Sequence, residues 1–446
     1  MIPIHVRKGY DLKIVGDPSR EVEVLENPDK VAVLPEKIPL IKPRLKIKVD
    51  DNVKVGSILF EDKKNPDLKF LSPGGGKVVQ INYGHRRVIK EIVIKLDSDE
   101  EYEEFEPVSE NLLDHIEREK LVKKILAGGL WPLIRELPFR NIAAPHQSPP
   151  GIFINLCNLE PFQPDPEVYL EGKSDLFKFG IQILKKLTHN KVYIFASPDS
   201  SAALKRLNEY VTHEVYGKYP ADDPGVFLYY TRKSSSDNRA WYISGQDVML
   251  LAHLIKYGRY PIFRTVVLAG QSTTQRKHIQ TRLGAPIASF AKDHSRDHDL
   301  RYIVGGVFKG YAQTEETYLG LYETSLTLIP EGGEKEFFGF LRPGFSKSSF
   351  SRTFLSFFNN SQLKMDCNLH GEERACINCG YCPRVCPVDI LPQFTFKSIL
   401  ADEVEESLAH GLLDCVECGL CTYVCPSKIE LRAAFKEAKE AYYKEL

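Results

Sequence analysis

Eight of the ten cysteines in this 446-residue chain lie in two copies of one short pattern near its C-terminus. The pattern is C-x2-C-x2-C-x3-C-P, over residues 376–387 and again over 415–426. Bacterial ferredoxins bind cubane [4Fe-4S] clusters with this spacing. Three thiolates at such short intervals let a tight loop wrap one corner of a cluster, whereas the fourth, one residue further on and followed by proline, points elsewhere. The sequence therefore predicts two [4Fe-4S] clusters and electron transfer.

The fourth cysteine of each run is expected to bind the cluster of the other run, as it does in two-cluster proteins of this kind. The predicted ligands of the first cluster are Cys376, Cys379, Cys382 and Cys425. The predicted ligands of the second cluster are Cys415, Cys418, Cys421 and Cys386.

Zinc and disulfides explain these cysteines less well. Structural zinc usually takes two C-x2-C pairs with a spacer between them, so four cysteines within eleven residues would leave thiolates unused. Sulfurs in so dense a run are poorly placed for bridging, and nothing marks the chain as secreted. Of the other two cysteines, Cys157 lies in an apolar run and is interpreted as a buried small hydrophobe. Cys367 is interpreted as a spare thiol.

Length and composition indicate an ordinary multidomain globular protein. A chain of this length divides into about three or four domains, and 43% apolar with 27% charged residues suits such domains. The formal net charge of −1 gives no bulk-charge signal for nucleic-acid binding. No signal-peptide core and no eighteen-residue apolar stretch are found, so the chain is not expected to cross a membrane by itself. Oxygen-sensitive clusters place it in the cytoplasm.

The first domain, residues 1–105, is predicted to be a barrel-sandwich hybrid. Strand-like alternation between turns runs over residues 42–96 and resembles a biotinyl/lipoyl-like fold. The Gly-rich segment 72–76 is interpreted as a turn instead of a phosphate cradle, because a strand follows it. The acidic segment 97–106 is interpreted as a solvated linker.

The second domain, residues 106–260, is predicted to be a Rossmann-like α/β layer. Helices are expected over 112–126, 247–255 and, after the N-capping residues 197–201, up to about residue 210; strands are expected over 192–196 and 225–230. The strand-to-helix turns lack G-x-G-x-x-G, so a dinucleotide site has no direct support.

The remaining residues are predicted to form a β-grasp domain over 261–335 and a helical ferredoxin-like domain over 336–446. The β-grasp prediction has strands over 263–270, 301–304 and 325–329 and a helix over 280–283; the last domain has a helix over 396–409 and a capping box at 427–430 before the terminal helix. Aromatic residues in 337–341 and 354–358 are assigned to core packing, with a docking surface as the alternative. His278, His294 and His298 are interpreted as surface or turn residues.

Segments spread over nearly the whole chain resemble the A subunits of the Na+-translocating NADH:quinone reductases. They include Gly-Leu-Trp-Pro at 129–132, Arg-Pro-Gly-Phe at 342–345 and Gly-Glu-Glu-Arg-Ala at 371–375. Further matching segments are 7–12, 268–270, 281–285, 351–353, 389–392 and 421–428. Together these segments are specific for the family, although most are not when taken singly.

The resemblance implies a peripheral subunit on the cytoplasmic face of the inner (plasma) membrane of a bacterium. The complex would oxidise NADH, reduce quinone and export Na+, with NADH oxidation and ion transport mainly in partner subunits. This chain would provide assembly contacts and an electron relay, and it would not be catalytic alone. A quinone is a candidate ligand, flavin is not expected, and membrane contact would be made through partner subunits.

The complete cysteine runs are a departure, because well-known members of this family lack most of these cysteines. The runs are similar to those of the C subunits of Rnf-type complexes, so the alternative is an electron-input subunit of a ferredoxin:NAD+ oxidoreductase. In that family a Gly-rich flavin and NADH loop should lie at residues 128–135, where this chain has a bulky Trp-Pro. A third hypothesis is an assembly scaffold whose clusters only staple the C-terminal helices.

Overall fold

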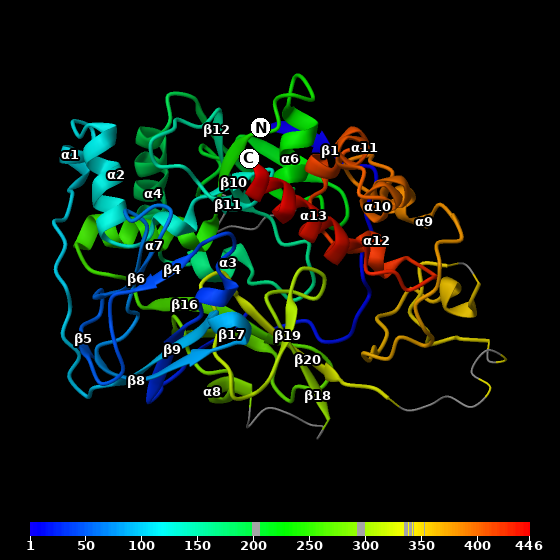
Figure 1. The fold of residues 1–446 in the computed structure, drawn as a ribbon, viewed down its shortest axis with the longest axis horizontal. Helices are drawn as coiled ribbons and strands as arrows, with labels where there is room; N and C mark the ends of the chain where they lie inside the picture. Colours follow the sequence, from blue (N-terminus) through cyan, green and yellow to red (C-terminus); the bar gives the residue numbers. More distant parts are fainter. Residues whose placement is uncertain (199–205, 292–298, 334–337, 339–340, 342, 352) are drawn as a thin grey trace.

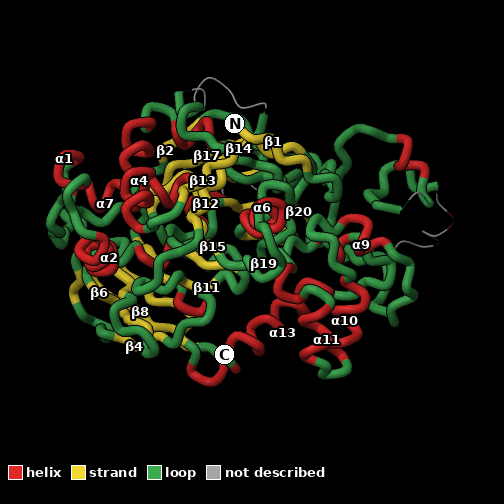
Figure 2. The backbone as a smooth tube through the Cα atoms, turned by 90° about the horizontal axis from the view of Figure 1, so that it is seen from above, coloured by secondary structure: helices red, strands yellow, loops and turns green. Residues whose placement is uncertain are grey.

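The computed structural model describes residues 1–198, 206–291, 299–333, 338, 341, 343–351 and 353–446 (Figure 1). These residues form four β-sheets and a helical C-terminal part, which lies to one side of the strands (Figure 2). No helix within these ranges is long and apolar enough to cross a membrane.

The first two sheets form the predicted barrel-sandwich. One is ordered β3-β9-β8-β5 and the other β4-β6-β7. Their strands are β3 (Lys30–Val33), β4 (Pro43–Leu45), β5 (Asn52–Val53), β6 (Ile58–Asp62), β7 (Lys69–Leu71), β8 (Gly76–Tyr83) and β9 (Ile89–Leu96). Buried apolar side chains from both sheets pack in one core, with Phe60 stacked on Phe70 at 4.5 Å between ring centroids. Gly76 opens β8, which confirms that the Gly-rich segment is a turn.

The acidic segment 97–106 is only in part the solvated linker that we expected, because most of its residues are exposed but Glu100 is not. The Glu100 carboxylate lies 2.5 Å from the guanidinium of Arg282, whose side chain is 1% exposed, and it accepts the amide of Gly75 at 2.7 Å. Backbone hydrogen bonds also join residues 101 and 103 to Val55. A buried guanidinium needs a charged partner, and the segment supplies it.

The third sheet belongs to the predicted Rossmann-like domain and is ordered β1-β14-β13-β12-β15-β10-β11. The first five strands in this order are parallel, β10 runs antiparallel to β15, and β11 runs antiparallel to β10. The strands are β1 (Ile2–His5), β10 (Arg135–Leu137), β11 (Asn141–Ile142), β12 (Gly151–Leu156), β13 (Lys191–Ala196), β14 (His213–Tyr216) and β15 (Ala240–Ser244). The helices are α1 (Glu110–Leu113), α2 (Arg118–Ala127), α3 (Pro166–Leu170), α4 (Ser174–Leu187), α6 (Pro224–Thr231) and α7 (Gly245–Tyr257).

The two faces of this sheet are covered differently. Alternate strand residues such as Ile152 and Ile154 pack in one core with α4 and α7. Phe153 and Phe195 point the other way, into a core shared with α6 and the C-terminal helices. The cysteine-bearing domain is therefore packed against one face of the α/β sheet.

Local predictions in this domain had mixed outcomes. Strand β13 and helix α7 are confirmed, whereas the helix expected over 112–126 is divided between α1 and α2. The strand expected over 225–230 is wrong, because these residues lie in α6. Asp223 caps that helix by accepting the Gly225 amide at 2.8 Å, and an apolar run buried on several sides carries no helical period. Residues 199–205, within the predicted third helix, lie outside the described part.

The fourth sheet confirms the β-grasp prediction. Its order is β19-β18-β20-β16-β17-β2, with β16 and β20 parallel at the centre. The elements are β2 (Val22–Val24), β16 (Phe263–Ala269), β17 (Lys277–Arg282), α8 (Ala288–Ala291), β18 (Leu300–Val304), β19 (Tyr311–Gln313) and β20 (Ser325–Pro330). The helix expected over 280–283 is wrong, because residues 277–282 form β17. The strand was missed because it buries the polar residues Thr281 and Arg282, so its sequence does not alternate between apolar and polar residues.

Two N-terminal strands pair outside the barrel-sandwich. β1 pairs with β14 of the α/β sheet, and β2 pairs with β17 of the β-grasp sheet. The domain boundaries 1–105, 106–260, 261–335 and 336–446 stay a prediction.

The C-terminal domain is helical, as predicted for a ferredoxin-like unit. Its helices are α9 (Tyr381–Val385), α10 (Pro392–Leu400), α11 (Val404–Ala409), α12 (Leu420–Tyr423) and α13 (Leu431–Glu445). The single helix expected over 396–409 is divided between α10 and α11, with Asp402 at φ +56° between them. The predicted capping box at 427–430 is not formed before α13, because the Ser427 hydroxyl donates to the Ala375 carbonyl at 3.0 Å instead. Leu431 and Phe435 form the predicted inner face of α13.

The described aromatic side chains of 337–341 and 354–358 are mostly exposed. Phe357 is 49% exposed and Phe358 is 79% exposed, whereas Phe354 is half-buried. The core-packing interpretation is therefore wrong for Phe357 and Phe358. Phe337 and Phe340, in the same segment, lie outside the described residues.

Candidate iron–sulfur sites

The first cysteine run forms a tight loop that ends in helix α9. Asn378 at φ +54° and Gly380 at φ +72° turn the backbone, and α9 then begins at Tyr381. The four thiols predicted to bind the first cluster line one pocket: Cys376, Cys379, Cys382 and Cys425. The pocket thus brings the last cysteine of the second run to the first run.

The second run repeats this geometry. Glu417 at φ +54° and Gly419 at φ +80° occupy the equivalent positions, and α12 begins at Leu420. The same spacing of cysteines therefore gives the same loop twice. Both Cys418 and the distant Cys386 are 8% exposed and belong to the core shared with the α/β sheet.

Electrostatic coupling relates Cys386 to the second run. Burial raises the pKa of the Cys386 thiol to about 12, and the neighbouring Cys415 raises that pKa further. Burial also raises the pKa of Cys418, and Cys386 and Cys415 add to this rise. Cys386 and Cys418 are buried in one core, and the half-buried Cys415 packs against it. Because the buried thiols would be protonated at neutral pH, cluster binding must release protons.

The donor set fits iron–sulfur clusters. Each of the two groups supplies four thiols, which is the number that a [4Fe-4S] cluster needs when each thiolate binds a different iron. A site for a single metal ion is a different case: within the described ranges, no three His, Cys, Asp or Glu side chains gather closely enough to hold one ion.

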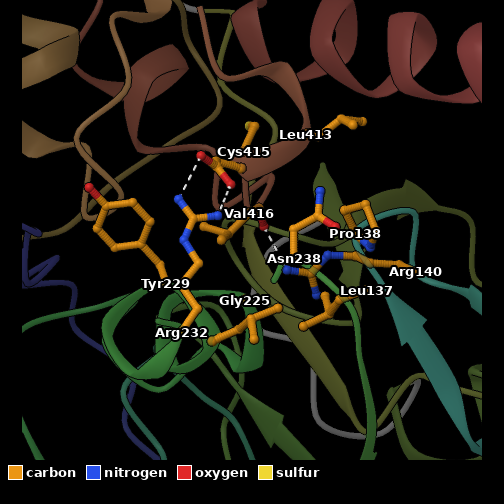
Figure 3. A pocket seen from close by; sticks show the side chains of 12 residues that line it. Leu137, Pro138, Arg140, Gly225, Tyr229, Arg232, Asn238, Leu413, Cys415 and Val416 are labelled. Atoms are coloured by element: carbon orange, nitrogen blue, oxygen red, sulfur yellow. Dashed lines mark hydrogen bonds and ion pairs between the residues drawn. The ribbon is translucent and has the colours of Figure 1, made fainter. Parts of the chain in front are cut away.

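Side chains from two other elements bind the second loop. The Arg140 guanidinium donates to the Val416 carbonyl at 2.9 Å (Figure 3). Lys439, on α13, donates to the Cys415 carbonyl at 3.0 Å. The loop is also anchored just before Cys415, because Arg232 forms a bidentate ion pair with Asp414 at 2.5 and 3.0 Å.

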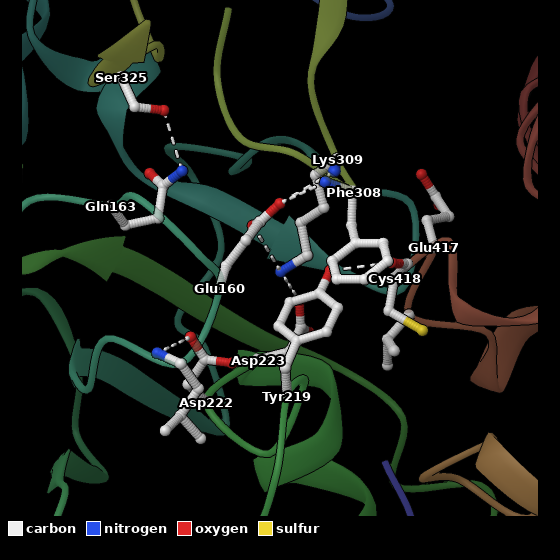
Figure 4. Close-up of polar contacts among 12 residues, drawn as sticks. Glu160, Gln163, Tyr219, Asp222, Asp223, Phe308, Lys309, Ser325, Glu417 and Cys418 are labelled. Atoms are coloured by element: carbon white, nitrogen blue, oxygen red, sulfur yellow. Dashed lines mark hydrogen bonds and ion pairs between the residues drawn. The ribbon is translucent and has the colours of Figure 1, made fainter. Parts of the chain in front are cut away.

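A cluster of buried charges lies next to this loop, at the carboxyl ends of β12 and β15 (Figure 4). Lys309 lies 2.9 Å from Asp223 and 4.0 Å from Glu160, beside a cavity of about 250 Å³. Burial raises the pKa of the Glu160 and Asp222 carboxyls. Burial alone would also raise the pKa of Asp223, but Arg140 and Lys309 hold it well below its usual value.

Sequence reasoning did not find this charge cluster. Its members come from four separate segments, and none carries a motif. The Asp-Asp-Pro sequence at 222–224 was a usable signal, because Asp before Pro is typical of a helix start. With α6 assigned as a strand, that signal was lost.

Two other site predictions are settled by the structure. Cys157 is 9% exposed, which confirms a buried thiol. His278 is not a surface or turn residue: it is 1% exposed on β17, donates from Nδ1 to the Ser19 carbonyl at 2.7 Å and accepts the Asp165 amide at Nε2. His294 and His298 lie outside the described residues. Cys367 is half-buried, and burial raises its pKa to about 11.

The segment expected to hold a Gly-rich loop in Rnf-type proteins is packed into the core. Trp131 is 0% exposed, and its indole nitrogen donates to the Ala143 carbonyl at 2.7 Å. Its ring meets Trp241 edge-on. A Cβ on Gly129 would lie 2.4 Å from the Leu71 side chain, so the backbone here approaches protein instead of a ligand.

Known families match three parts of the chain. Residues 4–97 match the NqrA N-terminal barrel-sandwich hybrid domain, and residues 116–260 match the NqrA second alpha/beta domain. Residues 375–429 match the 4Fe-4S dicluster domain.

Curated relatives match nearly the whole chain. The A subunit of the Na(+)-translocating NADH-quinone reductase of Yersinia pseudotuberculosis serotype O:1b is 34% identical over 414 residues, which cover 92% of both chains. Those of Pasteurella multocida and Neisseria meningitidis serogroup B are 32% identical with the same coverage. The chain belongs to this A-subunit family. A solved NAD+-reducing [NiFe]-hydrogenase is similar to this chain at 14% identity, over 66% of this chain and 57% of that one. Its TM-score of 0.34 is too low to indicate a common overall fold.

Within the NqrA family, this chain therefore combines the barrel-sandwich and α/β domains with an iron–sulfur domain. Its eight clustered cysteines and the match to a 4Fe-4S dicluster domain support iron–sulfur binding.

Proposed function

We propose that this protein is a peripheral electron-carrying subunit of a Na+-translocating NADH:quinone reductase complex, with two [4Fe-4S] clusters as its relay. The observation that carries the proposal is the pair of four-thiol groups in a chain of the NqrA family. NADH oxidation, quinone reduction and Na+ export belong to the complex. The core-packed Trp131 loop supports placing NADH oxidation in partner subunits, and a quinone stays a candidate ligand.

The proposed ligands follow the crossed pattern. Cys425 completes the first cluster, which is supported by its place in the first pocket. Cys386 completes the second cluster, which is supported by its burial in one core with Cys418 and the half-buried Cys415. The clusters would supply reversible one-electron storage. The chain supplies the thiolates, excludes water from the second site and holds both runs in one domain.

Iron and acid-labile sulfide assays on anaerobically purified protein test the clusters, together with low-temperature EPR. We expect about eight irons and eight sulfides per chain. Cys386→Ser should remove the EPR signal of the second-run cluster and leave the other. Cys367→Ser, outside both runs, is the matched control and should keep both. Zinc without labile sulfide would refute the clusters, and loss of only the first-run cluster in Cys386→Ser would refute the crossing.

We propose a position on the cytoplasmic face of the inner membrane, with attachment through partner subunits. The exposed aromatic residues between 338 and 358 support a docking role for that segment. Deleting the membrane partners should leave the protein in the soluble fraction. Phe354→Ser with Phe357→Ser should weaken complex assembly while both clusters form. Loss of the clusters in this variant would contradict docking.

The complete cysteine runs also favour the second candidate, an Rnf-like electron-input subunit. Flavin in the gently purified chain, or rapid NADH-dependent bleaching of its clusters without partners, would favour that candidate over a relay. An assembly scaffold predicts a different result: NADH would leave the clusters oxidised even in the intact complex.

A further inference from the structure

Every carbonyl of the second loop from residue 415 to 418 accepts a hydrogen bond from a side chain outside the loop. In loop order the pairs are Lys439 to Cys415 at 3.0 Å, Arg140 to Val416 at 2.9 Å, Arg432 to Glu417 at 3.0 Å and Tyr219 to Cys418 at 2.8 Å. Three of the four donors are cationic.

These donors converge from two parts of the fold. Arg140 follows β10 and Tyr219 precedes α6, so both belong to the α/β domain, whereas Lys439 and Arg432 lie on α13. The Lys439 side chain is 3% exposed. Tyr219 is 0% exposed and stacks on Phe308 at 4.8 Å. The donors are therefore held in place by packing.

The side chains that contact the second loop carry an excess of positive charge. Lys439, Arg140 and Arg432 contribute three cations, and two carboxylates are paired with them: Glu417 lies 2.7 Å from Lys439, and Asp223 lies 2.7 Å from Arg140. Lys309, 5.4 Å above the Tyr219 ring, adds no further excess, because it shares Asp223 and lies 4.0 Å from Glu160. Because these groups are largely shielded from water, their charges are screened weakly.

The first loop has a different environment. Among the described residues, no side chain donates to a carbonyl between 376 and 379. Ile377 is 67% exposed, and Cys379 is exposed. Water and dissolved ions can therefore screen charge at the first site.

We propose that Lys439, Arg140 and Arg432 are positioning residues that hold the second cluster at a higher reduction potential than the first. The exposed first cluster then exchanges electrons with a partner redox centre, and the second is the inner acceptor. This inference rests on the proposed presence of both clusters. Reduction adds one negative charge to a cluster, and fixed cations favour that charge. Burial alone would act in the opposite direction, so the cations decide the order.

The electron balance is simple. One electron leaves the reduced first cluster, which is oxidised by one unit, and enters the oxidised second cluster, which is reduced by one unit. No bond breaks, and no proton or further reactant is needed.

The test is an EPR-monitored redox titration of the full chain carrying both clusters. Two midpoints are expected, the higher one belonging to the second cluster. The signals are assigned with Cys379→Ser, which changes only the spectrum of the first cluster. Lys439→Met keeps the length of the side chain and removes its charge; it should lower the second midpoint and leave the first unchanged. Lys439→Arg should restore the second midpoint.

Two further variants keep the test decisive. Arg432→Gln removes another cation that contacts the loop, at the Glu417 carbonyl, so it answers the question if Lys439→Met loses its cluster. Tyr219→Phe removes one neutral donor and should give a smaller downward shift of the same midpoint. Lys436→Met is the matched control on α13, because its side chain is 54% exposed and its charge is screened.

The outcomes separate the two levels of the proposal. A wild-type chain with fewer than two clusters would refute the proposed function. Two clusters with equal midpoints, or with the first midpoint higher, would overturn the inference alone. So would a second midpoint that is the same in Lys439→Met as in the wild type or, where that variant loses its cluster, the same in Arg432→Gln as in the wild type.

Discussion

The two cysteine loops have the same backbone turns but different surroundings. Residues 378 and 417 share the left-handed conformation, and glycine follows two positions later in both loops. Yet Ile377 is 67% exposed, whereas Val416, the equivalent residue, is 4% exposed. The short-range cysteine spacing thus shapes each loop. Long-range packing decides whether its cluster faces water or a fixed set of charges.

Breaking the strongest contact of the second loop should have the largest effect. Arg140→Ala removes the partner of a buried carboxylate, and we expect a loss of about 3 kcal/mol because Asp223 keeps Lys309. Arg232→Ala, at the more exposed pair with Asp414, should cost about 1 kcal/mol or less. Thermal unfolding followed by circular dichroism measures both. Equal losses of unfolding free energy in the two variants would mean that the Arg140–Asp223 pair stabilises the fold no more than the Arg232–Asp414 pair.

The equivalent residues Val416 and Ile377 give a matched pair of truncations. Val416→Ala deletes buried methyl groups and should lower the free energy of unfolding by about 2 kcal/mol. Ile377→Ala removes an exposed side chain and should change it by less than about 0.5 kcal/mol. Denaturant titration of the two variants compares them directly. A larger loss from Ile377→Ala would show that the first loop is covered in the protein.

Iron loss should also distinguish the loops. A chelator reaches the exposed first site without disturbing the α/β domain, whereas the second site must open locally. We expect the first cluster to lose iron roughly tenfold faster, which corresponds to about 1.4 kcal/mol of local opening. Loss of each EPR signal during incubation gives the two rates. Simultaneous loss would indicate that both clusters leave in one opening step.

The smallest effect is a pH dependence near the second loop. Because burial raises the pKa of Glu160, its folded-state pKa lies above the unfolded value of about 4.3. Such a group contributes stability below its unfolded pKa, and that stability is lost as pH rises through the folded pKa. Glu160→Gln should therefore raise the Tm more at pH 8 than at pH 5. Glu405→Gln, at an exposed residue of α11, is the control and should show no such difference.

Much of the site could be predicted from the sequence because its information is local. The spacing of the cysteines names eight thiols as the proposed ligands, and four of them line one pocket. The environment of the thiols could not be predicted in this way. Arg140 and Val416 are 276 residues apart, and Tyr219 and Cys418 are 199 residues apart. Neither pair has a sequence signature.

The fold shows the same limit. Strand β13 was predicted from a short continuous apolar run, and the inner face of α13 from apolar residues that repeat with a helical period. Helix α6 was taken for a strand because it is apolar on several sides, and β17 was missed because it buries Thr281 and Arg282. Periodicity fails where tertiary partners cover more than one face or accept polar side chains. The buried Glu100–Arg282 pair is such a case.

The pairing of β1 and β2 has a consequence for the order in which the protein is made. β1 and β2 leave the ribosome well before their partners β14 and β17, which begin at His213 and Lys277. At about 5–20 residues per second, these strands wait on the order of 10–50 s for a partner. The intervening barrel-sandwich can fold during that time, because its strands all lie between residues 30 and 96. Nascent chains would then carry a folded module next to an unpaired N-terminal segment, which a ribosome-associated chaperone could protect until the central sheet closes.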